Sequence, residues 1–367
     1  MKFGIVTHYD VHNHGAVLQL TALVKVLARK GIEAKALQFD KNYDFLGVAL
    51  KSKYDISLKS VGFYIKFLLR EGVGRTLYNV KKRQTLNRFK VENNLIGEFY
   101  TDASGLDAVV VGSDEVFALH TGPTPIFFGH AAPTNCVFSY AASFGPTTYE
   151  DIQSKHCIEF VKSGLERMAG VSVRDKNSQD IVVRLTGDVP ALVCDPVLLY
   201  GYVDEIKQLR KPDLPPYLLV YAYDNRMNDE QEVERIKEYA RKMGLKIVSP
   251  GFYHKWSDYN VNIDPVGLLA YFKYAQCVVT DTFHGSVMSI ITQSQFVVKT
   301  RDNSNKLVNL LNEYGLTDRI SVSLDDLEGR FASAIDFSAV EVEVVRRRAE
   351  SMKYLDQMIK KADEHSR

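Results

Sequence analysis

Apolar residues in this chain come in short runs, and each run is followed by a polar loop and then by an amphipathic stretch. The first run covers residues 2–7, the loop covers 10–14, and apolar residues then recur at helical spacing from Gly15 to Gly31. Residues 34–39 form the next apolar run. A strand, a loop, a helix and a second strand in this order predict a parallel sheet with a right-handed crossover.

The same alternation continues on both sides of a proline-rich segment, 207–216. The pattern predicts strands at 108–111, 137–141, 171–173, 191–194, 217–223, 245–249, 277–280 and 296–299. It predicts helices at 152–168, 178–185, 229–243, 266–275, 286–292 and 304–314. We therefore expect an α/β protein with two Rossmann-like parallel-sheet domains, 1–206 and 216–338. A charged amphipathic helix at 339–367 is expected to pack back on the N-terminal domain.

Segment 42–102 differs from the rest of the first domain because it is rich in lysine and arginine. Its apolar residues recur at helical spacing, which predicts one or two amphipathic helices in a basic insertion. One interpretation is a surface insertion whose charges are solvated. The other is a peripheral contact with a membrane through 51–90, in which basic side chains meet lipid headgroups.

Composition limits the classes of partner and the compartment. The formal net charge of +1 gives no reason to expect nucleic acid as a partner. The four cysteines lack the spacing of a metal site, so we expect buried thiols in a reducing compartment and neither metal nor cofactor. The sequence shows no signal-peptide pattern and no apolar run near the ~18 residues of a membrane span, which favours the cytoplasm, including the inner face of the membrane. The sequence does not indicate an oligomeric state.

Chemistry is expected at the carboxyl ends of the predicted strands, where open parallel sheets bind ligands. One strand ends directly before Asp281 and Thr282, and His284 and Gly285 then open a helix. Free N–H groups at a helix N-terminus attract phosphate or carboxylate, and histidine exchanges protons near neutral pH. We therefore expect Asp281 and His284 to be catalytic, and Thr282, Gly285 and Ser286 to bind substrate. The alternative is that Asp281 or Thr282 only caps the helix while His284 packs in the core.

Two further strand ends carry polar residues. The first loop contains Asn13, His14 and Gly15, which we expect to contact substrate, since its histidines lack the partners of a metal site. Further along, Ser113 lies in a tight turn after a strand and is expected to bind substrate, and Asp114 is expected to be catalytic because it could accept a hydroxyl proton. The simpler alternatives are an ordinary turn in the first case and a helix cap in the second.

Four basic residues follow predicted strands or the helices next to them: Arg174, Arg301, Lys306 and Arg319. Arginine binds carboxylate and phosphate through paired hydrogen bonds. Each residue alone is equally consistent with a solvated surface charge. Together, at strand ends, they indicate an anionic substrate.

The order of these motifs resembles the polysaccharide pyruvyltransferase family over roughly residues 1–325. The segments that carry the resemblance are Asn13-His14-Gly15-Ala16-Val17-Leu18-Gln19, Val111-Gly112-Ser113-Asp114-Glu115-Val116-Phe117, Ser139-Tyr140-Ala141-Ala142-Ser143-Phe144-Gly145, Ser172-Val173-Arg174, Asp195-Pro196 and Asp281-Thr282-Phe283-His284-Gly285. The resemblance implies a GT-B-like fold. It also implies transfer of pyruvate from phosphoenolpyruvate onto two hydroxyls of a sugar, as a ketal, in polysaccharide biosynthesis. Ser143 joins the expected substrate-binding residues through its motif.

The sequence departs from the family pattern at Thr282, where many members have arginine, and at Glu115, which replaces glutamine. The missing arginine removes one expected contact with phosphoenolpyruvate. Arg174, Arg301 or Arg319 would have to compensate, or the donor is a different molecule.

The resulting hypothesis is a ketal pyruvyltransferase in which His284 moves a proton and Asp114 or Asp281 orients it or activates the sugar hydroxyl. Arg174 and Arg301 would bind the donor, and the acceptor sugar is free or lipid-linked. A GT-B-like glycosyltransferase that uses a nucleotide sugar fits two Rossmann-like domains equally well. The third hypothesis is a non-catalytic sugar-binding member of a polysaccharide assembly complex.

Overall fold

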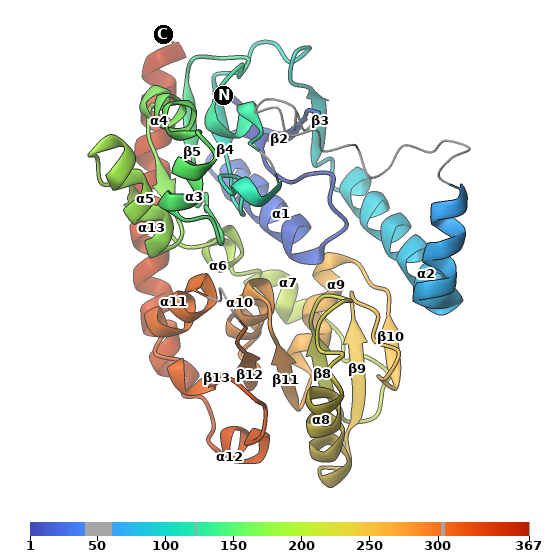
Figure 1. Ribbon diagram of the computed structural model, residues 1–367. Coiled ribbons are helices and arrows are strands. Elements are labelled where there is room, and N and C mark those ends of the chain that lie inside the picture. Colours follow the sequence, from blue (N-terminus) through green and yellow to red (C-terminus); the bar gives the residue numbers. More distant parts are fainter. Residues whose placement is uncertain (41–60, 122, 302–304, 367) are drawn as a thin grey trace.

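The computed structural model describes residues 1–40, 61–121, 123–301 and 305–366. Two parallel β-sheets form the centres of two units, and helices pack around each sheet (Figure 1). The predicted fold class, α/β with two Rossmann-like units, is confirmed. Strands such as β4 (Ala108–Val111) are apolar and buried at every position, because both faces of the sheet are covered.

The first sheet has the strand order β3-β2-β1-β4-β5, and all of its pairs are parallel. Its strands are β1 (Lys2–Val6), β2 (Glu33–Gln38), β3 (Ile96–Phe99), β4 and β5 (Val137–Ser139). The short pair β6 (Ser172–Val173) and β7 (Ala191–Leu192) continues the sheet beyond β5 through isolated bridges. The strand order reverses at β1, which has β2 on one side and β4 on the other.

The second sheet has the order β10-β9-β8-β11-β12-β13 and is also parallel throughout. Its strands are β8 (Tyr217–Tyr221), β9 (Lys246–Pro250), β10 (Tyr259–Val261), β11 (Cys277–Thr280), β12 (Phe296–Lys299) and β13 (Ile320–Ser321). Here the order reverses at β8, between β9 and β11. Ligands of open parallel sheets bind beyond the carboxyl ends of strands at such reversals, so each sheet offers half of a site.

The helices of the first unit are α1 (His14–Arg29), α2 (Val61–Glu92), α3 (Tyr149–Ser154), α4 (Ile158–Arg167), α5 (Lys176–Thr186), α6 (Pro196–Tyr200) and α7 (Val203–Gln208), with short 3₁₀ turns η3 (Leu119–Thr121) and η4 (Pro125–Phe128). Those of the second are α8 (Glu230–Lys242), α9 (Pro265–Lys273), α10 (Phe283–Thr292), α11 (Asn305–Glu313), η5 (Thr317–Arg319) and α12 (Leu327–Ala332). Among the described residues, no helix combines the length and apolarity that crossing a bilayer requires.

The last helix, α13 (Phe337–Ser366), starts beside the second sheet and runs along the first unit (Figure 1). The hydroxyl of Tyr354 donates to the carbonyl of Ser139 at 2.8 Å, and Ser351 Oγ accepts from the backbone N–H of Cys194 at 2.9 Å. The predicted return of the C-terminal helix to the first unit is therefore confirmed.

One predicted helix is wrong, because residues 152–168 form two helices instead of one. His156 adopts a left-handed backbone conformation with φ 54°, and the next N–H, that of Cys157, donates to the carbonyl of Ile152. This turn ends α3 and starts α4 in a new direction. The apolar periodicity alone gave no sign of the break.

The basic insertion expected at 42–102 is helical only in part. Its helix α2 has a kink at Gly72, where φ is 81°, and residues 42–60 lie outside the described part of the chain. At its end lies β3, a strand that the sequence pattern did not predict. The N–H of Ala36 donates to the carbonyl of Leu95 at 2.8 Å, and this short segment pairs with the edge of β2 that would otherwise be open.

Candidate active site

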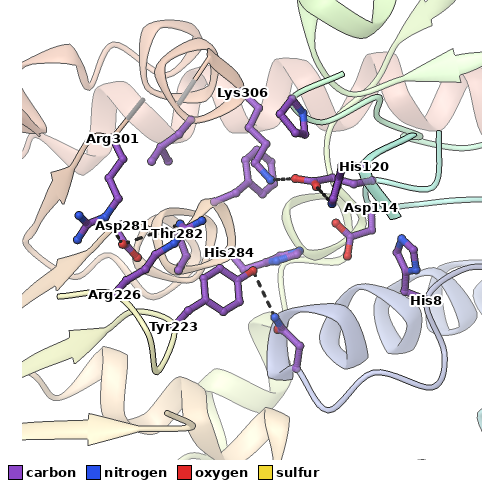
Figure 2. Close-up of a pocket in the computed structure, with 15 residues that line it drawn as sticks. His8, Asp114, His120, Tyr223, Arg226, Asp281, Thr282, His284, Arg301 and Lys306 are labelled. Atoms are coloured by element: carbon purple, nitrogen blue, oxygen red, sulfur yellow. Dashed lines mark hydrogen bonds and ion pairs between the residues drawn. The ribbon is translucent and has the colours of Figure 1, made fainter. Parts of the chain in front are cut away.

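A cavity of about 510 Å³ opens between the two units, at the strand-order reversals of both sheets (Figure 2). It is lined by residues that follow β1, β4 and β5 on one side and β8, β11 and β12 on the other: His8, Asn13, Asp114, Glu115, His120, Pro146, Tyr223, Arg226, Asp281, Thr282, Phe283, His284, Arg301, Lys306 and Leu307. Most of these side chains are polar or charged. The cavity therefore suits a polar ligand that carries charge.

The end of β11 presents a helix N-terminus to this cavity. Thr282 is the N-cap of α10, and its hydroxyl accepts a hydrogen bond from the N–H of Gly285 at 2.9 Å. Thr280 Oγ1 donates to the carbonyl of Tyr221 at 2.6 Å, which ties the turn to the neighbouring strand β8. A side chain at Gly285 would collide with Thr280, so glycine is needed where the helix starts against the strand end.

The N-termini of α1 and α10 meet at His284. A Cβ atom placed on Gly15, in the first turn of α1, would lie 2.4 Å from Cγ of His284. Glycine at position 15 thus makes room for the imidazole ring. Both helices direct the positive ends of their dipoles towards this region, which favours a negatively charged ligand.

His284 is almost fully buried, with 8% of the residue exposed, and its Nε2 has no hydrogen-bond partner among the described residues. Burial lowers the pKa of the ring, although Asp195 and Asp114 oppose this effect. Nε2 lies 3.9 Å from Oδ2 of Asp195. Burial therefore favours the neutral form of His284, and its Nε2 is buried on the side of Asp195 while the residue lines the cavity.

Arg174 links the carboxylates around His284. Its guanidinium donates to Oδ2 of Asp195 at 3.0 Å and to Oδ1 of Asp114 at 3.1 Å, and it lies 4.4 Å from the ring centroid of Phe283. Although burial opposes the charged form, Asp114 and Asp195 raise the pKa of Arg174. In turn, burial works against ionisation of Asp114, but the combined positive charges around it, Arg174 first among them, lower the pKa of this carboxyl. The cluster is thus a largely buried network of charges that reaches the cavity at Asp114.

Two contacts join the two units across the cavity. Lys306, in α11, forms an ion pair with Glu115, and Asn13 Nδ2 donates to the hydroxyl of Tyr223 at 3.5 Å (Figure 2). Burial opposes ionisation of Glu115, yet Lys306 lowers its pKa overall. Both contacts involve residues that line the cavity, so a ligand there would replace or adjust them.

A second carboxylate cluster lies at the end of β11. Arg301 donates through Nε to Oδ2 of Asp281 at 2.8 Å and through its terminal nitrogens to Glu232 at 2.9 and 3.2 Å. Burial raises the pKa of Asp281, against the opposing effects of Arg301 and Arg226. Figure 2 shows that Arg226 and Arg301 both reach towards Asp281.

Arg226 supplies positive charge near Thr282, where the family pattern has arginine. It follows β8, and its terminal nitrogen lies 3.9 Å from Oδ2 of Asp281. Its guanidinium stacks over Tyr223 at 5.0 Å from the ring centroid. The side chain remains 42% exposed, which leaves the guanidinium accessible from the cavity.

The structure brings seven of the fifteen predicted site residues into the lining of this cavity. Those that line it are Asn13, Asp114, Asp281, Thr282, His284, Arg301 and Lys306. Gly15 and Gly285 lie against the lining residues His284 and Thr282, and Arg174 packs against Phe283.

Five predicted site residues lie elsewhere, in packed surroundings. Ser113 donates to Gln19 at 2.6 Å, and Ser143 donates to Asp175 at 2.6 Å. Ser286 is buried and bonds within its own helix. The remaining two are His14, whose Nε2 lies 2.8 Å from the carbonyl of Ile263, and Arg319, which binds Asp318 and the carbonyls of Arg330 and Ser333.

Several cavity residues were not predicted as site residues: His8, Glu115, His120, Tyr223 and Arg226. His8 and Glu115 adjoin motifs that were recognised, so extending each motif by a few residues would have found them. Tyr223 and Arg226 follow β8, the strand at the reversal of the second sheet. Tyr223 is the last residue of the predicted strand 217–223 and Arg226 follows it, which was the available signal, but the strand order that makes this position important was unknown.

Comparisons with known proteins agree with this architecture. A family model described as polysaccharide pyruvyl transferase matches residues 13–303. No curated protein matches the chain.

Similar solved structures include UDP-N-acetylglucosamine 2-epimerases from Rickettsia bellii, Neisseria meningitidis and Methanocaldococcus jannaschii. Their TM-scores are 0.55, 0.52 and 0.51, at 10%, 13% and 14% sequence identity. The alignments cover 99%, 98% and 98% of this chain and 97%, 100% and 99% of those chains, respectively. At these identities the likeness establishes the two-unit fold alone.

Proposed function

Since the chain belongs to the polysaccharide pyruvyl transferase family, we propose that it transfers pyruvate from phosphoenolpyruvate onto two hydroxyls of a sugar, forming a ketal. The observation that carries this proposal is the cavity in which His284, a neutral buried base, meets Arg226, Arg301 and Lys306. Such a combination suits a reaction that binds a compact anion and moves protons.

The donor carries a carboxylate and a phosphate and therefore needs several positive partners. Arg226, Arg301 and Lys306 line the cavity and surround the N-terminus of α10. In our proposal these three side chains, with the N–H groups of the helix, hold the donor in place of the arginine that Thr282 replaces. Lys306 then exchanges its partner Glu115 for the donor.

The reaction consumes two hydroxyl protons and releases inorganic phosphate. One sugar hydroxyl adds to the carbon that carries the phosphate, while the methylene group of the donor gains a proton and becomes a methyl group. Phosphate then leaves, and the second hydroxyl adds to the same carbon to close the ketal. One of the two hydroxyl protons balances the methyl group, and the other leaves with phosphate.

His284 is the proposed carrier of these protons because it lines the cavity, its Nε2 has no hydrogen-bond partner among the described residues, and its pKa is lowered. A neutral imidazole accepts a hydroxyl proton and can return it to the donor. Asp114, fixed by Arg174, keeps a negative charge close to the ring and stabilises the imidazolium that forms. Asp281 has a raised pKa and an unpartnered Oδ1 among the described residues, so it is the proposed second group that exchanges a proton.

Release of phosphate from phosphoenolpyruvate, measured with and without sugar acceptors, tests the proposal. Galactose-, mannose- and glucosamine-type acceptors, free and lipid-linked, form the panel. His284→Ala should lower turnover by about 10²- to 10⁴-fold with the fold intact. The matched control is His156→Asn, at an exposed turn. Full activity of the His284→Ala protein would remove His284 from the mechanism.

Binding measurements separate this function from its alternatives. Saturable thermal stabilisation by phosphoenolpyruvate, and none by nucleotide sugars, is expected for the pyruvyl transferase. The reverse result would favour a glycosyltransferase that uses a nucleotide sugar, which the same fold can accommodate. Sugar binding without acceptor-dependent phosphate release across the panel would favour a non-catalytic member of an assembly complex.

The proposed reaction takes place in the cytoplasm. All four cysteines, Cys136, Cys157, Cys194 and Cys277, are buried free thiols. Free thiols are typical of a reducing compartment.

A further inference from the structure

Helix α2 has an exposed apolar stripe along one side. Val73, Leu77 and Val80 follow each other at spacings of four and three residues, so their side chains lie on the same face of the helix. They are 60%, 57% and 51% exposed. A contiguous row of exposed aliphatic side chains on an otherwise polar surface indicates a contact surface.

The opposite side of α2 is anchored to both units. Tyr78 donates to the carbonyl of Val261 at 2.8 Å, and Lys90 donates to the carbonyl of Tyr9 at 3.1 Å. Lys82 is buried and lies 4.3 Å from the ring centroid of Phe252. The helix lies on the flank of the molecule (Figure 1). The contacts fix its rotation, and the exposure of Val73, Leu77 and Val80 shows that the apolar stripe faces outward.

Basic side chains border the stripe on both sides. Lys81 and Arg88 lie on one side at helical spacing, Arg83 lies on the other, and all three are exposed. Glu92 is the one acidic residue in the sequence from 72 to 92. The whole chain has a net charge of only +1, so positive charge is concentrated on this helix.

We propose that this surface, defined by Val73, Leu77, Val80, Lys81, Arg83 and Arg88, docks on an anionic lipid bilayer. The aliphatic stripe would enter the headgroup boundary while the flanking cations meet lipid phosphates. Each lysine or arginine near an anionic surface strengthens binding about fivefold. A second copy of the chain is a poorer occupant, because it would place like charges opposite each other.

Co-sedimentation of the full chain with lipid vesicles tests the docking surface. We expect binding to vesicles that contain phosphatidylglycerol, weak binding to pure phosphatidylcholine, and loss of binding at high salt. The triple variant K81Q/R83Q/R88Q should bind about 100-fold more weakly, since three cations are removed. The variant L77Q/V80Q should also bind several-fold more weakly, because the apolar contact is lost.

Matched controls exist elsewhere on the surface. K207Q/R210Q/K211Q removes three exposed cations from the segment between the two sheets, and V342Q/V345Q removes two exposed aliphatic side chains from α13. Both controls should bind vesicles like the unmodified chain. Thermal unfolding of every variant checks that the fold is retained.

Several results would overturn the proposal. It fails if the chain does not prefer anionic vesicles, or if the α2 variants bind as well as the two controls. A concentration-dependent dimer that L77Q/V80Q abolishes, without vesicle binding, would assign the surface to a second copy. Binding of an acidic protein, without binding of vesicles, would also contradict the proposal. Vesicle binding requires no turnover, so its outcome is independent of the proposed reaction.

Discussion

His14 and His284 are both buried in the first turn of a helix, yet their surroundings give them different properties. The ring of His14 bonds to the carbonyl of Ile263, and burial, together with the charge of Lys82, lowers its pKa to about 3. His284 has Asp195 and Asp114 close by, and these partly oppose the effect of burial. One histidine is therefore a neutral packing residue, while the other is able to take up a proton.

We predict that the charge of Asp195 keeps the pKa of His284 from falling further. Replacing it as Asp195→Asn keeps an oxygen for the α6 cap but removes the negative charge 3.9 Å from Nε2. The pKa of His284 should then fall further, and the acid limb of the pH–rate profile should move to lower pH. Titration of the His284 ring by nuclear magnetic resonance measures this change in pKa without an activity assay. Asp213→Asn, at an exposed site, serves as the control, and an unchanged titration of His284 would exclude this effect.

His14 should make the fold sensitive to acid. Its pKa is about 3 when folded and near the ordinary 6.5 when unfolded, so the unfolded chain binds the proton first as the pH falls. The contribution of His14 to the free energy of unfolding is fully present above about pH 6.5 and decreases by about 4 kcal/mol by pH 3. The substitution His14→Gln should remove this dependence of the free energy of unfolding on pH. The measurement is the free energy of unfolding against pH for both proteins, and parallel curves would contradict the assignment.

At the scale of elements, the site depends on how closely the N-termini of α1 and α10 approach. Neither helix end forms the site alone, because α1 follows β1 of the first sheet and α10 follows β11 of the second sheet. Gly15 allows the contact, since any Cβ at this position would overlap the ring of His284. The approach of two helix dipoles is thus a consequence of packing between the units.

Gly15→Ala should force these helices apart. We expect a loss of about 1–3 kcal/mol in the free energy of unfolding, because the added methyl group overlaps His284. Combining it with His284→Ala should recover most of this loss, since the second change removes the ring. A double-mutant cycle from chemical denaturation measures this coupling. Strictly additive effects would show that the two residues are not in contact.

At the scale of the whole molecule, the two units share one apolar core. Residues from both sheets, such as Phe3 and Val278, belong to the same contiguous cluster, and so does Leu355 of α13. The helix α13 also bonds to the first unit through Tyr354 and Ser351. We therefore expect the two sheets to unfold together.

Leu355→Ala tests this cooperativity. The residue is fully buried, so the change should cost about 2–5 kcal/mol, whereas Val342→Ala at an exposed position of α13 should cost little. Trp256 is the single tryptophan and lies in the second unit, far along the chain from Leu355. Its fluorescence transition should shift together with the circular dichroism signal. An unchanged Trp256 transition would show that the units unfold separately.

The local pattern of the sequence predicted most of the strands and helices and one half of the site. Apolar runs of strand length and helical periodicity are local properties, and they predicted the two sheets and the helix α13. The order strand–Asp281–Thr282–His284–Gly285 also placed a histidine at a helix N-terminus without knowledge of the fold. These features can be predicted locally, because the spacing of apolar residues within one segment indicates whether that segment forms a strand or a helix.

Tertiary structure alone decided which polar residues share the cavity. Ser113, Ser143 and Arg319 follow the same sequence rules as His284, but they bond to core or backbone partners instead. Arg226 and Tyr223 joined the site because β8 lies at the strand-order reversal of the second sheet. Strand order and the contact between units depend on residues that are far apart in the chain, so a local pattern contains little information about them.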